Sequence, residues 1–183
     1  MVKKIKLSKK IAAKAKKIKI LISDVDGVLT DGCVYYSASG EELKKFSLKD
    51  GMGIERLRQL AGIETIFLTR ENSSIVTQRA IKLKIENAFL GVKEKKEFIE
   101  KFAEEKKLKL EEIAYIGDDV NDLEAIKIIG LSACPSDSFY EIIKNVDYVC
   151  EAKGGNGAFR EFAEILIEAN KKKIKGKQNE KQN

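Results

Sequence analysis

Residues 18–32, with the sequence IKILISDVDGVLTDG, carry the clearest structural signal in the chain. Their first half is a short apolar run that stops at Asp24, a pattern that indicates a buried strand. Their second half, from Asp24 to Gly32, combines Asp and Gly residues that favour a loop. We therefore expect the folded body to begin with a buried strand followed by an acidic loop.

Strand and helix patterns alternate from there to the end of the chain. A hairpin flap is expected after the first strand, with its strands at 34–36 and 45–48 on either side of Ser39-Gly40-Glu41. The later pattern predicts strands at 65–68, 87–90, 113–116, 131–133 and 148–149, and helices at 53–60, 74–84, 94–107, 119–129, 138–144 and 158–170. A further short helix is expected after Ser8, a good N-cap residue. This alternation predicts an α/β fold, a Rossmann-like, doubly wound parallel sheet with helices on both faces.

Four residues stand just past the ends of predicted strands. They are Asp24, Thr69, Gly91 and Asp118. In open parallel sheets, ligands bind in the crevice outside the carboxyl ends of the strands. We therefore expect these four loops to meet at one crevice.

Two acids, Asp24 and Asp26, are spaced i, i+2 in the first of these loops. If the chain turns between them, both carboxylates can approach one point. One could then attack an electrophile while the other passes a proton. The alternative is an ordinary turn, in which Asp and Gly are common.

Three more acids open a predicted helix in the sequence Gly117-Asp118-Asp119-Val120-Asn121-Asp122. Capping of the helix N-terminus explains one or two of them. Three crowded acids repel one another, however, and a cation would relieve that repulsion. Ligands that are all oxygen, in a chain without His, favour Mg²⁺.

A hydroxyl and several lysines complete the set. Thr69 could bind an anion together with backbone N–H groups at a helix start, although an N-cap Thr is the simpler interpretation. The lysines that follow Gly91 could reach an anion held between the acids. A nucleophilic carboxylate, a second acid, a Mg²⁺ site, a Lys and a hydroxyl on one rim are the groups that phosphoryl transfer needs.

Composition excludes several other classes of function. The chain has no His, which removes Ser-His-Asp catalysis and His-ligated zinc. Nine lysines and no acid lie in residues 1–19, and six lysines with one Glu lie in 171–183, so the body is acidic and only the ends are basic. Basic ends without aromatic residues do not indicate nucleic-acid binding. The chain contains no run of 18 apolar residues, so no membrane span is expected. Its three scattered cysteines favour a reducing cytoplasm.

Residues 18–170 resemble the haloacid dehalogenase superfamily of Mg²⁺-dependent phosphatases. The similar motifs are Asp24–Gly32, Leu68-Thr69, Lys95 and Gly117–Asp122. Within that superfamily the chain is similar to the 3-deoxy-D-manno-octulosonate 8-phosphate (KDO 8-phosphate) phosphatases. The shared features are Thr30-Asp31-Gly32, the hairpin ending at residues 41–46, residues 49–54 and the late segment 154–161.

The resemblance implies a role for each matching residue. Asp24 is implied to be the nucleophile and a Mg²⁺ ligand, and Asp26 the acid and base, with its carbonyl on the metal. Asp118 is implied to be a further metal ligand, with Asp119 and Asp122 behind it. Thr69 and Lys95 are implied to hold the phosphoryl group.

The resemblance also implies an architecture. It implies a basic N-terminal extension at 1–17, a phosphatase domain at 18–170 and a basic C-terminal tail at 171–183. The hairpin is too short to be a cap domain, and capless relatives close their sites by forming a homotetramer.

The second motif departs from the family pattern. KDO 8-phosphate phosphatases usually have Thr-Gly-Arg there, whereas this chain has Thr69-Arg70-Glu71. Related phosphatases of nine-carbon acid 9-phosphates (KDN or N-acylneuraminate) tend toward an acid at the place of Glu71. The substrate is therefore expected to be either the eight-carbon or the nine-carbon sugar acid. A phosphotransferase, or a non-catalytic domain that partners a sugar-acid cytidylyltransferase, is a further alternative.

Overall fold

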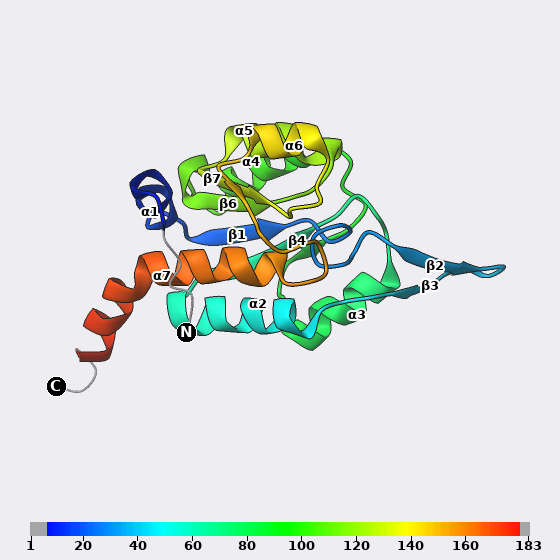
Figure 1. The fold of residues 1–183 in the computed structure, drawn as a ribbon, viewed down its shortest axis with the longest axis horizontal. Helices are drawn as coiled ribbons and strands as arrows, with labels where there is room; N and C mark the ends of the chain where they lie inside the picture. The colour runs from blue at the N-terminus through cyan, green and yellow to red at the C-terminus, as the bar shows by residue number, and fades with distance from the viewer. Residues whose placement is uncertain (1–6, 180–183) are drawn as a thin grey trace.

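A six-stranded parallel sheet forms the centre of the computed structural model, which describes residues 7–179 (Figure 1). The strand order is β5-β4-β1-β6-β7-β8. The strands are β1 (Ile20–Ser23), β4 (Glu64–Leu68), β5 (Ala88–Phe89), β6 (Ile113–Ile116), β7 (Leu131–Cys134) and β8 (Tyr148–Val149). The chain builds outward from β1 in one direction through β4 and β5, then in the other through β6, β7 and β8. The predicted doubly wound sheet is confirmed, and its direction switches between β1 and β6.

Helices cover both faces of the sheet (Figure 1). On one face lie α2 (Leu48–Ala61), α3 (Ser74–Leu83) and α7 (Ala158–Asn179), and on the other α4 (Lys95–Glu105), α5 (Leu123–Ile128) and α6 (Tyr140–Asn145). Two short 3₁₀ helices, η1 (Leu110–Glu112) and η2 (Val120–Asp122), precede β6 and α5. Successive strand residues point to opposite faces, so Leu21 joins the core under α2 and α7 while Ile22 joins the core under α4 and α5. Burial on both faces explains the unbroken apolar run of β1.

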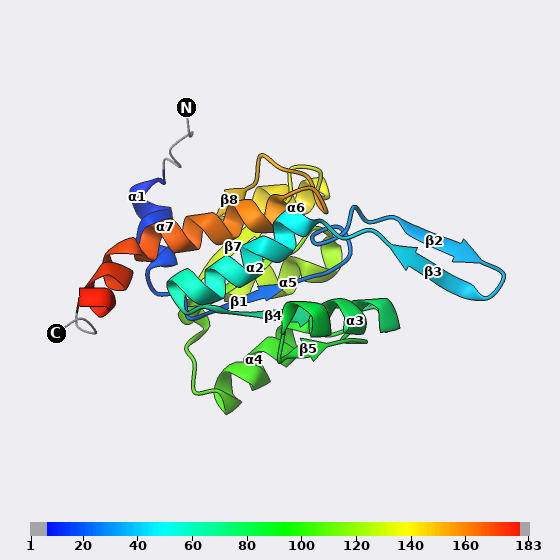
Figure 2. The same ribbon diagram turned by 90° about the horizontal axis from the view of Figure 1, so that it is seen from below.

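A two-stranded hairpin projects from the body beyond the carboxyl ends of the sheet strands (Figure 2). It consists of β2 (Val34–Ser37) and β3 (Gly40–Lys44), which pair antiparallel. The predicted second strand at 45–48 is wrong. Ser47 instead caps α2, because its Oγ accepts hydrogen bonds from the backbone N–H of Lys49 (3.1 Å) and of Asp50 (3.4 Å).

The start of α2 was also predicted too late, at residue 53. Glycines at 51 and 53 weaken the helical pattern, because Gly is a poor helix former. Gly53 is needed for packing, since a Cβ there would lie 2.9 Å from the Cα of Arg160 in α7. Gly53 therefore allows α2 to approach α7 closely, whereas a Cβ at Gly51 would meet the side chains of Arg79 and Leu83 in α3.

Helix α1 (Lys9–Ala15) and the end of α7 lie at the end of the molecule opposite the hairpin (Figure 2). Helix α1 is capped by Ser8, as predicted, and Asn170 of α7 donates a hydrogen bond to the carbonyl of Ala15 (3.3 Å). Helix α7 continues past residue 170 to Asn179. Residues 1–6 of the predicted extension and 180–183 of the predicted tail lie outside the described residues. No helix within residues 7–179 combines the length and apolarity that a membrane crossing requires.

Asp50 joins the two long helices of one face. Its side chain is buried, and its two oxygens accept hydrogen bonds from the backbone N–H groups of Gly157 (3.1 Å) and Arg160 (2.9 Å) at the start of α7. A carboxylate at a helix N-terminus is favourable, so a residue of α2 caps α7. Burial raises the pKa of Asp50.

We expect Asp50→Ala to lower the free energy of unfolding by about 2 kcal/mol, because two part-buried N–H groups at the start of α7 lose their acceptor. Urea unfolding followed by circular dichroism measures the change. The matched control is Lys49→Ala, at the exposed neighbouring position, which should change stability by less than about 0.5 kcal/mol. Equal stability of the two variants would contradict the capping role of Asp50.

Candidate active site

Three loops at the carboxyl ends of β1, β4 and β6 surround a cavity of about 220 Å³. It is lined by Asp24, Asp26, Gly27, Gly32, Thr69, Arg70, Glu71, Asp118, Asp119 and Asn121. β1 and β6 are the neighbouring strands at which the sheet changes direction, the position where open α/β sheets bind ligands. The structure therefore brings three of the four predicted loops together around the cavity, and Gly91, which follows β5, is not among the lining residues.

Asp24 is held at the end of β1. Its backbone N–H donates to the carbonyl of Ile116 (2.9 Å), so the pairing of β1 with β6 continues into the loop. Its Oδ1 accepts a hydrogen bond from the N–H of Val25 (2.7 Å), and the residue is only 5% exposed. Burial and the charge of Asp122 raise the pKa of Asp24 to about 7, against the opposing effect of Lys95.

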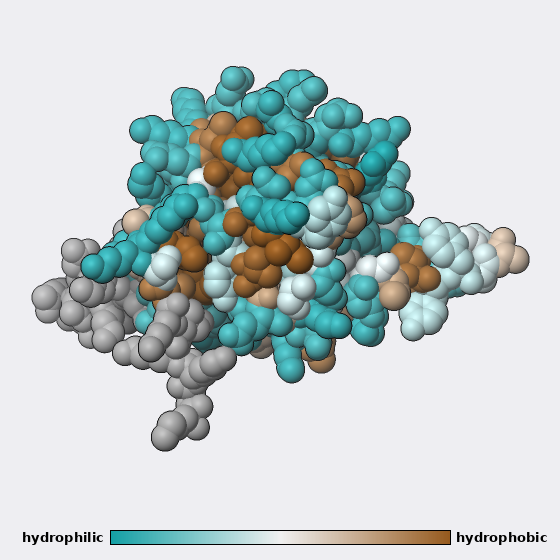
Figure 3. Space-filling model, turned by 45° about the horizontal axis from the view of Figure 1, so that its top comes forward, coloured by the Kyte–Doolittle hydropathy of each residue, from teal (hydrophilic) through white to brown (hydrophobic). Residues whose placement is uncertain are grey.

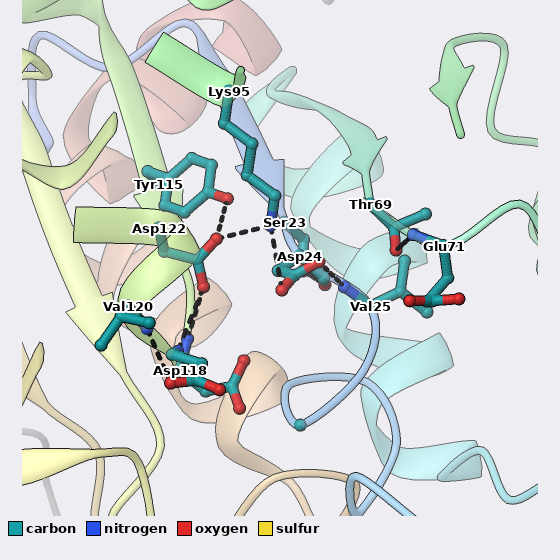
Figure 4. A network of polar contacts seen from close by, with 12 residues as sticks. Ser23, Asp24, Val25, Thr69, Glu71, Lys95, Tyr115, Asp118, Val120 and Asp122 are labelled. Carbon is teal, nitrogen blue, oxygen red and sulfur yellow. Dashed lines mark hydrogen bonds and ion pairs between the residues drawn. The ribbon is translucent and has the colours of Figure 1, made fainter. Parts of the chain in front are cut away.

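Lys95, the first residue of α4, lies behind the cavity between two acids (Figure 4). Its Nζ is 2.5 Å from Oδ1 of Asp122 and 3.0 Å from Oδ2 of Asp24. Burial lowers the pKa of Lys95, but the two carboxylates outweigh burial and the pKa is raised. Lys95 therefore remains a buried cation beside Asp24.

Asp122 organises the loop after β6. Besides Lys95, its Oδ1 accepts a hydrogen bond from the hydroxyl of Tyr115 (2.6 Å), and its Oδ2 accepts one from the N–H of Asp118 (2.9 Å). Sequence reasoning missed Tyr115, which lies inside a strand and has the pattern of an ordinary core residue. The predicted position of Asp122 behind Asp118 agrees with this geometry.

Asp119 has a different environment. It lines the cavity and caps η2, where its side chain accepts a hydrogen bond from the N–H of Val120 (2.7 Å). η2 and α5 replace the single helix predicted for 119–129. The short 3₁₀ turn lets Asp122 reach back to the N–H groups of Asp118 and Asp119.

Asp24, Asp118 and Asp122 each place a carboxylate oxygen within 4.8 Å of the others. Oδ1 of Asp118 is buried without a hydrogen-bond partner among the described residues. Burial and the charge of Asp24 raise the pKa of Asp118 to about 8. A buried orphan oxygen in an all-oxygen acidic cluster fits a hard divalent cation such as Mg²⁺.

Gly27 allows the first loop to approach this cluster. Its φ is +81°, and a Cβ there would lie 1.9 Å from Oδ2 of Asp118. A side chain at this position would collide with the acid and strain the backbone.

Thr69 follows β4, and its Oγ1 accepts a hydrogen bond from the N–H of Glu71 (3.1 Å). Arg70 and Glu71 line the cavity beside it. Thr69, Arg70 and Glu71 therefore line the same cavity as the acids, as expected from the sequence.

Asp26 has a partner that sequence reasoning missed. Its Oδ1 accepts a hydrogen bond from Nζ of Lys44 (2.6 Å), which comes from β3 of the hairpin. Residues 41–46 belong to the segment that resembles the family, but in a chain with 30 lysines nothing local assigns a role to Lys44. Only the path of the hairpin brings it to Asp26.

Comparison with known proteins gives concordant matches. A family model described as haloacid dehalogenase-like hydrolase matches residues 54–162. The 3-deoxy-D-manno-octulosonate 8-phosphate phosphatase of Haemophilus influenzae is 39% identical over 156 residues, covering 85% of this chain and 86% of that protein. A cobalt-bound structure of that enzyme matches with a TM-score of 0.82 and 39% identity, covering 85% of this chain and 91% of the other.

The corresponding phosphatase of Moraxella catarrhalis, solved with magnesium, phosphate and KDO, matches with a TM-score of 0.86 and 33% identity. That match covers 93% of this chain and 99% of the other. Two related structures thus contain different divalent metals, cobalt and magnesium.

The raised pKa values predict how stability depends on pH without metal. Asp24 and Asp118 have pKa values of about 7 and 8 in the folded protein, against 3.8 when unperturbed. Protonation therefore stabilises the fold fully below about pH 4, and this contribution is lost as pH rises through 7 and 8. With no His to titrate, we expect Tm in EDTA to fall by at least about 3 °C between pH 5 and 8, equivalent to about 1 kcal/mol. Differential scanning fluorimetry measures it.

Two additions make this test specific. Mg²⁺ at pH 8 should restore Tm, because a cation binds only the folded cluster. Asp118→Asn, which removes one of the two raised carboxyls, should show a smaller fall with pH and a smaller response to Mg²⁺. A Tm in EDTA that is constant or rises from pH 5 to 8 would contradict the expected destabilisation.

Proposed function

The chain belongs to the haloacid dehalogenase-like hydrolases and is a phosphoric monoester hydrolase, and we propose that its substrate is the terminal phosphate ester of a 2-keto-3-deoxy sugar acid of the KDO 8-phosphate type. We propose that hydrolysis depends on Mg²⁺ and passes through a phosphorylated Asp24. The observation that carries this proposal is the meeting of Asp24, Asp26 and Asp118 around one cavity, with Lys95 behind Asp24. The names of the related enzymes support the choice of substrate class.

Asp24 is the proposed nucleophile, and its surroundings favour that role. The N–H of Val25 holds one carboxylate oxygen and Lys95 the other, which fixes the direction of the carboxylate. Lys95 and the hydroxyl of Thr69 would hold phosphoryl oxygens during the transfer. When bound by Asp24, Asp118 and the carbonyl of Asp26, Mg²⁺ would neutralise charge on the phosphoryl oxygens.

Asp26 is the proposed acid and base. It would protonate the oxygen of the leaving sugar as the bond to phosphorus breaks. It would then take a proton from the water that attacks the phosphorylated Asp24. An unprotonated sugar alkoxide is a poor leaving group, so the first proton transfer matters most for this class of substrate.

The nine-carbon sugar-acid 9-phosphates form a second candidate substrate class, and Glu71 supports it. Glu71 lines the cavity, where an Arg would pair with the carboxylate of an eight-carbon acid. A Glu would instead repel a nearby carboxylate or accept hydrogen bonds from hydroxyl or amide groups.

We also propose that the protein assembles as a homotetramer through its hairpins. Tyr35, Tyr36, Leu43 and Leu48 are between 61% and 83% exposed on and beside the hairpin. In Figure 3 the projecting arm shows hydrophobic (brown) residues where it leaves the body and pale, near-neutral residues along most of its length. Exposed apolar side chains gathered on one projection support a role in contact between subunits.

Phosphate release from a panel of esters tests the function. With Mg²⁺, we expect turnover of KDO 8-phosphate, KDN 9-phosphate or N-acylneuraminate 9-phosphate, and none in excess EDTA. Asp24→Asn should lower turnover by at least about 1000-fold while circular dichroism stays unchanged, because an amide cannot attack phosphorus. Asn121→Ala, a cavity-lining change outside the proposed chemistry, is the matched control. Turnover by Asp24→Asn within tenfold of the parent would refute the nucleophile.

Glu71→Arg tests the choice between the two substrate classes. If Glu71 contacts the substrate, the ratio of kcat/KM values should shift toward the eight-carbon substrate by about tenfold, or about 1.4 kcal/mol. Glu71→Gln, which removes only the charge, is the control and should give a smaller shift. The alternative is that Glu71 only faces solvent near a helix start, and an unchanged ratio in both variants would establish that alternative.

A further inference from the structure

Lys44 is buried although it belongs to the projecting hairpin. Its side chain is 1% exposed, and its Nζ lies 2.6 Å from Oδ1 of Asp26 and 3.5 Å from Oε1 of Glu41. The adjacent Lys45 is 64% exposed and pairs with Asp31. The last residue of β3 therefore turns inward to the first loop, while the next residue turns toward solvent.

Glu41 extends this contact to a second loop. Its Oε1 accepts a hydrogen bond from Oγ of Ser73 (2.9 Å), the buried residue before α3. Strand β3 of the hairpin is thereby joined to the loop after β1 through Lys44 and to the loop after β4 through Glu41. These are two of the loops that surround the cavity.

The contact with Lys44 leaves the two oxygens of Asp26 in different environments. Oδ1 is occupied by the ammonium group, whereas Oδ2 is buried without a partner among the described residues, and Asp26 lines the cavity. Lys44 is not among the lining residues, so it reaches the cavity only through Asp26. The ammonium group is buried whereas the Asp26 side chain is 24% exposed, and breaking the pair would leave the buried charge of Lys44 uncompensated.

We propose that Lys44 is a positioning residue for proton transfer: it fixes the Asp26 carboxyl through Oδ1, so that Oδ2 meets the oxygen of the leaving group. This inference rests on the proposed function, in which Asp26 is the acid. It makes the hairpin part of the catalytic apparatus of its own subunit, independently of any contact between subunits.

The test compares two leaving groups in the parent and in Lys44→Met. An alkyl ester, the sugar-acid phosphate, needs a proton on its leaving oxygen, whereas p-nitrophenyl phosphate releases a stable phenolate without one. General acid catalysis contributes about 100-fold or more. We therefore expect Lys44→Met to lower kcat/KM by at least about tenfold for the alkyl ester and by less than about threefold for the aryl ester.

Three further variants separate positioning from folding. Lys45→Met, on the same hairpin, should leave kcat/KM for both esters within about twofold of the parent. Lys44→Arg keeps a cation that can donate to Oδ1 and should recover part of the loss on the alkyl ester. Lys44→Met should cost little when added to Asp26→Asn, because residues that act through one another are not additive.

Three other outcomes would overturn the proposal, and they can be told apart. Equal losses on both esters would mean that Lys44 only supports the fold, and no loss on either would mean that Asp26 is positioned without it. If Lys44→Met does not fold, Lys44→Gln provides the same comparison. A parent that hydrolyses neither ester would overturn the proposed function, and this role of Lys44 with it.

Discussion

The rest of the site depends on the contacts of the buried Lys95 ammonium group with Asp24 and Asp122. Asp24 and Asp122 approach each other from the ends of adjacent strands, and two carboxylates this close and this buried repel one another. Lys95 lies between them and compensates part of that charge. The hydroxyl of Tyr115 also donates to Oδ1 of Asp122, and the N–H of Asp118 donates to the other oxygen, Oδ2. The acid cluster is therefore held from behind, and its one buried oxygen without a partner among the described residues, Oδ1 of Asp118, belongs to a residue that lines the cavity.

This arrangement follows from the sheet. The chain continues from β1 toward β4 on one side of the sheet and from β6 toward β7 on the other. No crossover therefore covers the space between the loops after β1 and β6, and these two loops can meet there. Strands β1 and β6 end where their buried runs end. Asp24 and Asp118 follow these ends within two residues, so the strand ends determine the positions of both acids. The hairpin adds a third support, since it leaves the first loop and returns a lysine to Asp26.

The sequence predicted what depends on local pattern. The strands of the sheet, the helices between them and the meeting of Asp24, Thr69 and Asp118 follow from apolar runs and from the residues just past them. The second hairpin strand and the start of α2 were placed wrongly, because a cap by Ser47 and close packing at Gly53 outweighed local propensity. Tyr115 and Lys44 were missed because their partners are fixed only by tertiary structure. A buried tyrosine or one lysine among 30 carries no signal until the chain is folded.

The position of α1 and of the end of α7, at the opposite end of the molecule from the hairpin, has a practical consequence. Affinity tags, fluorescent proteins or surface anchors attached through α1 or the end of α7 would join the molecule on the side away from the hairpin. A molecule immobilised in this way would present its crevice and hairpin outward to the solution. The fold therefore places α1 and the end of α7, where such groups would be attached, at the opposite end of the molecule from the hairpin.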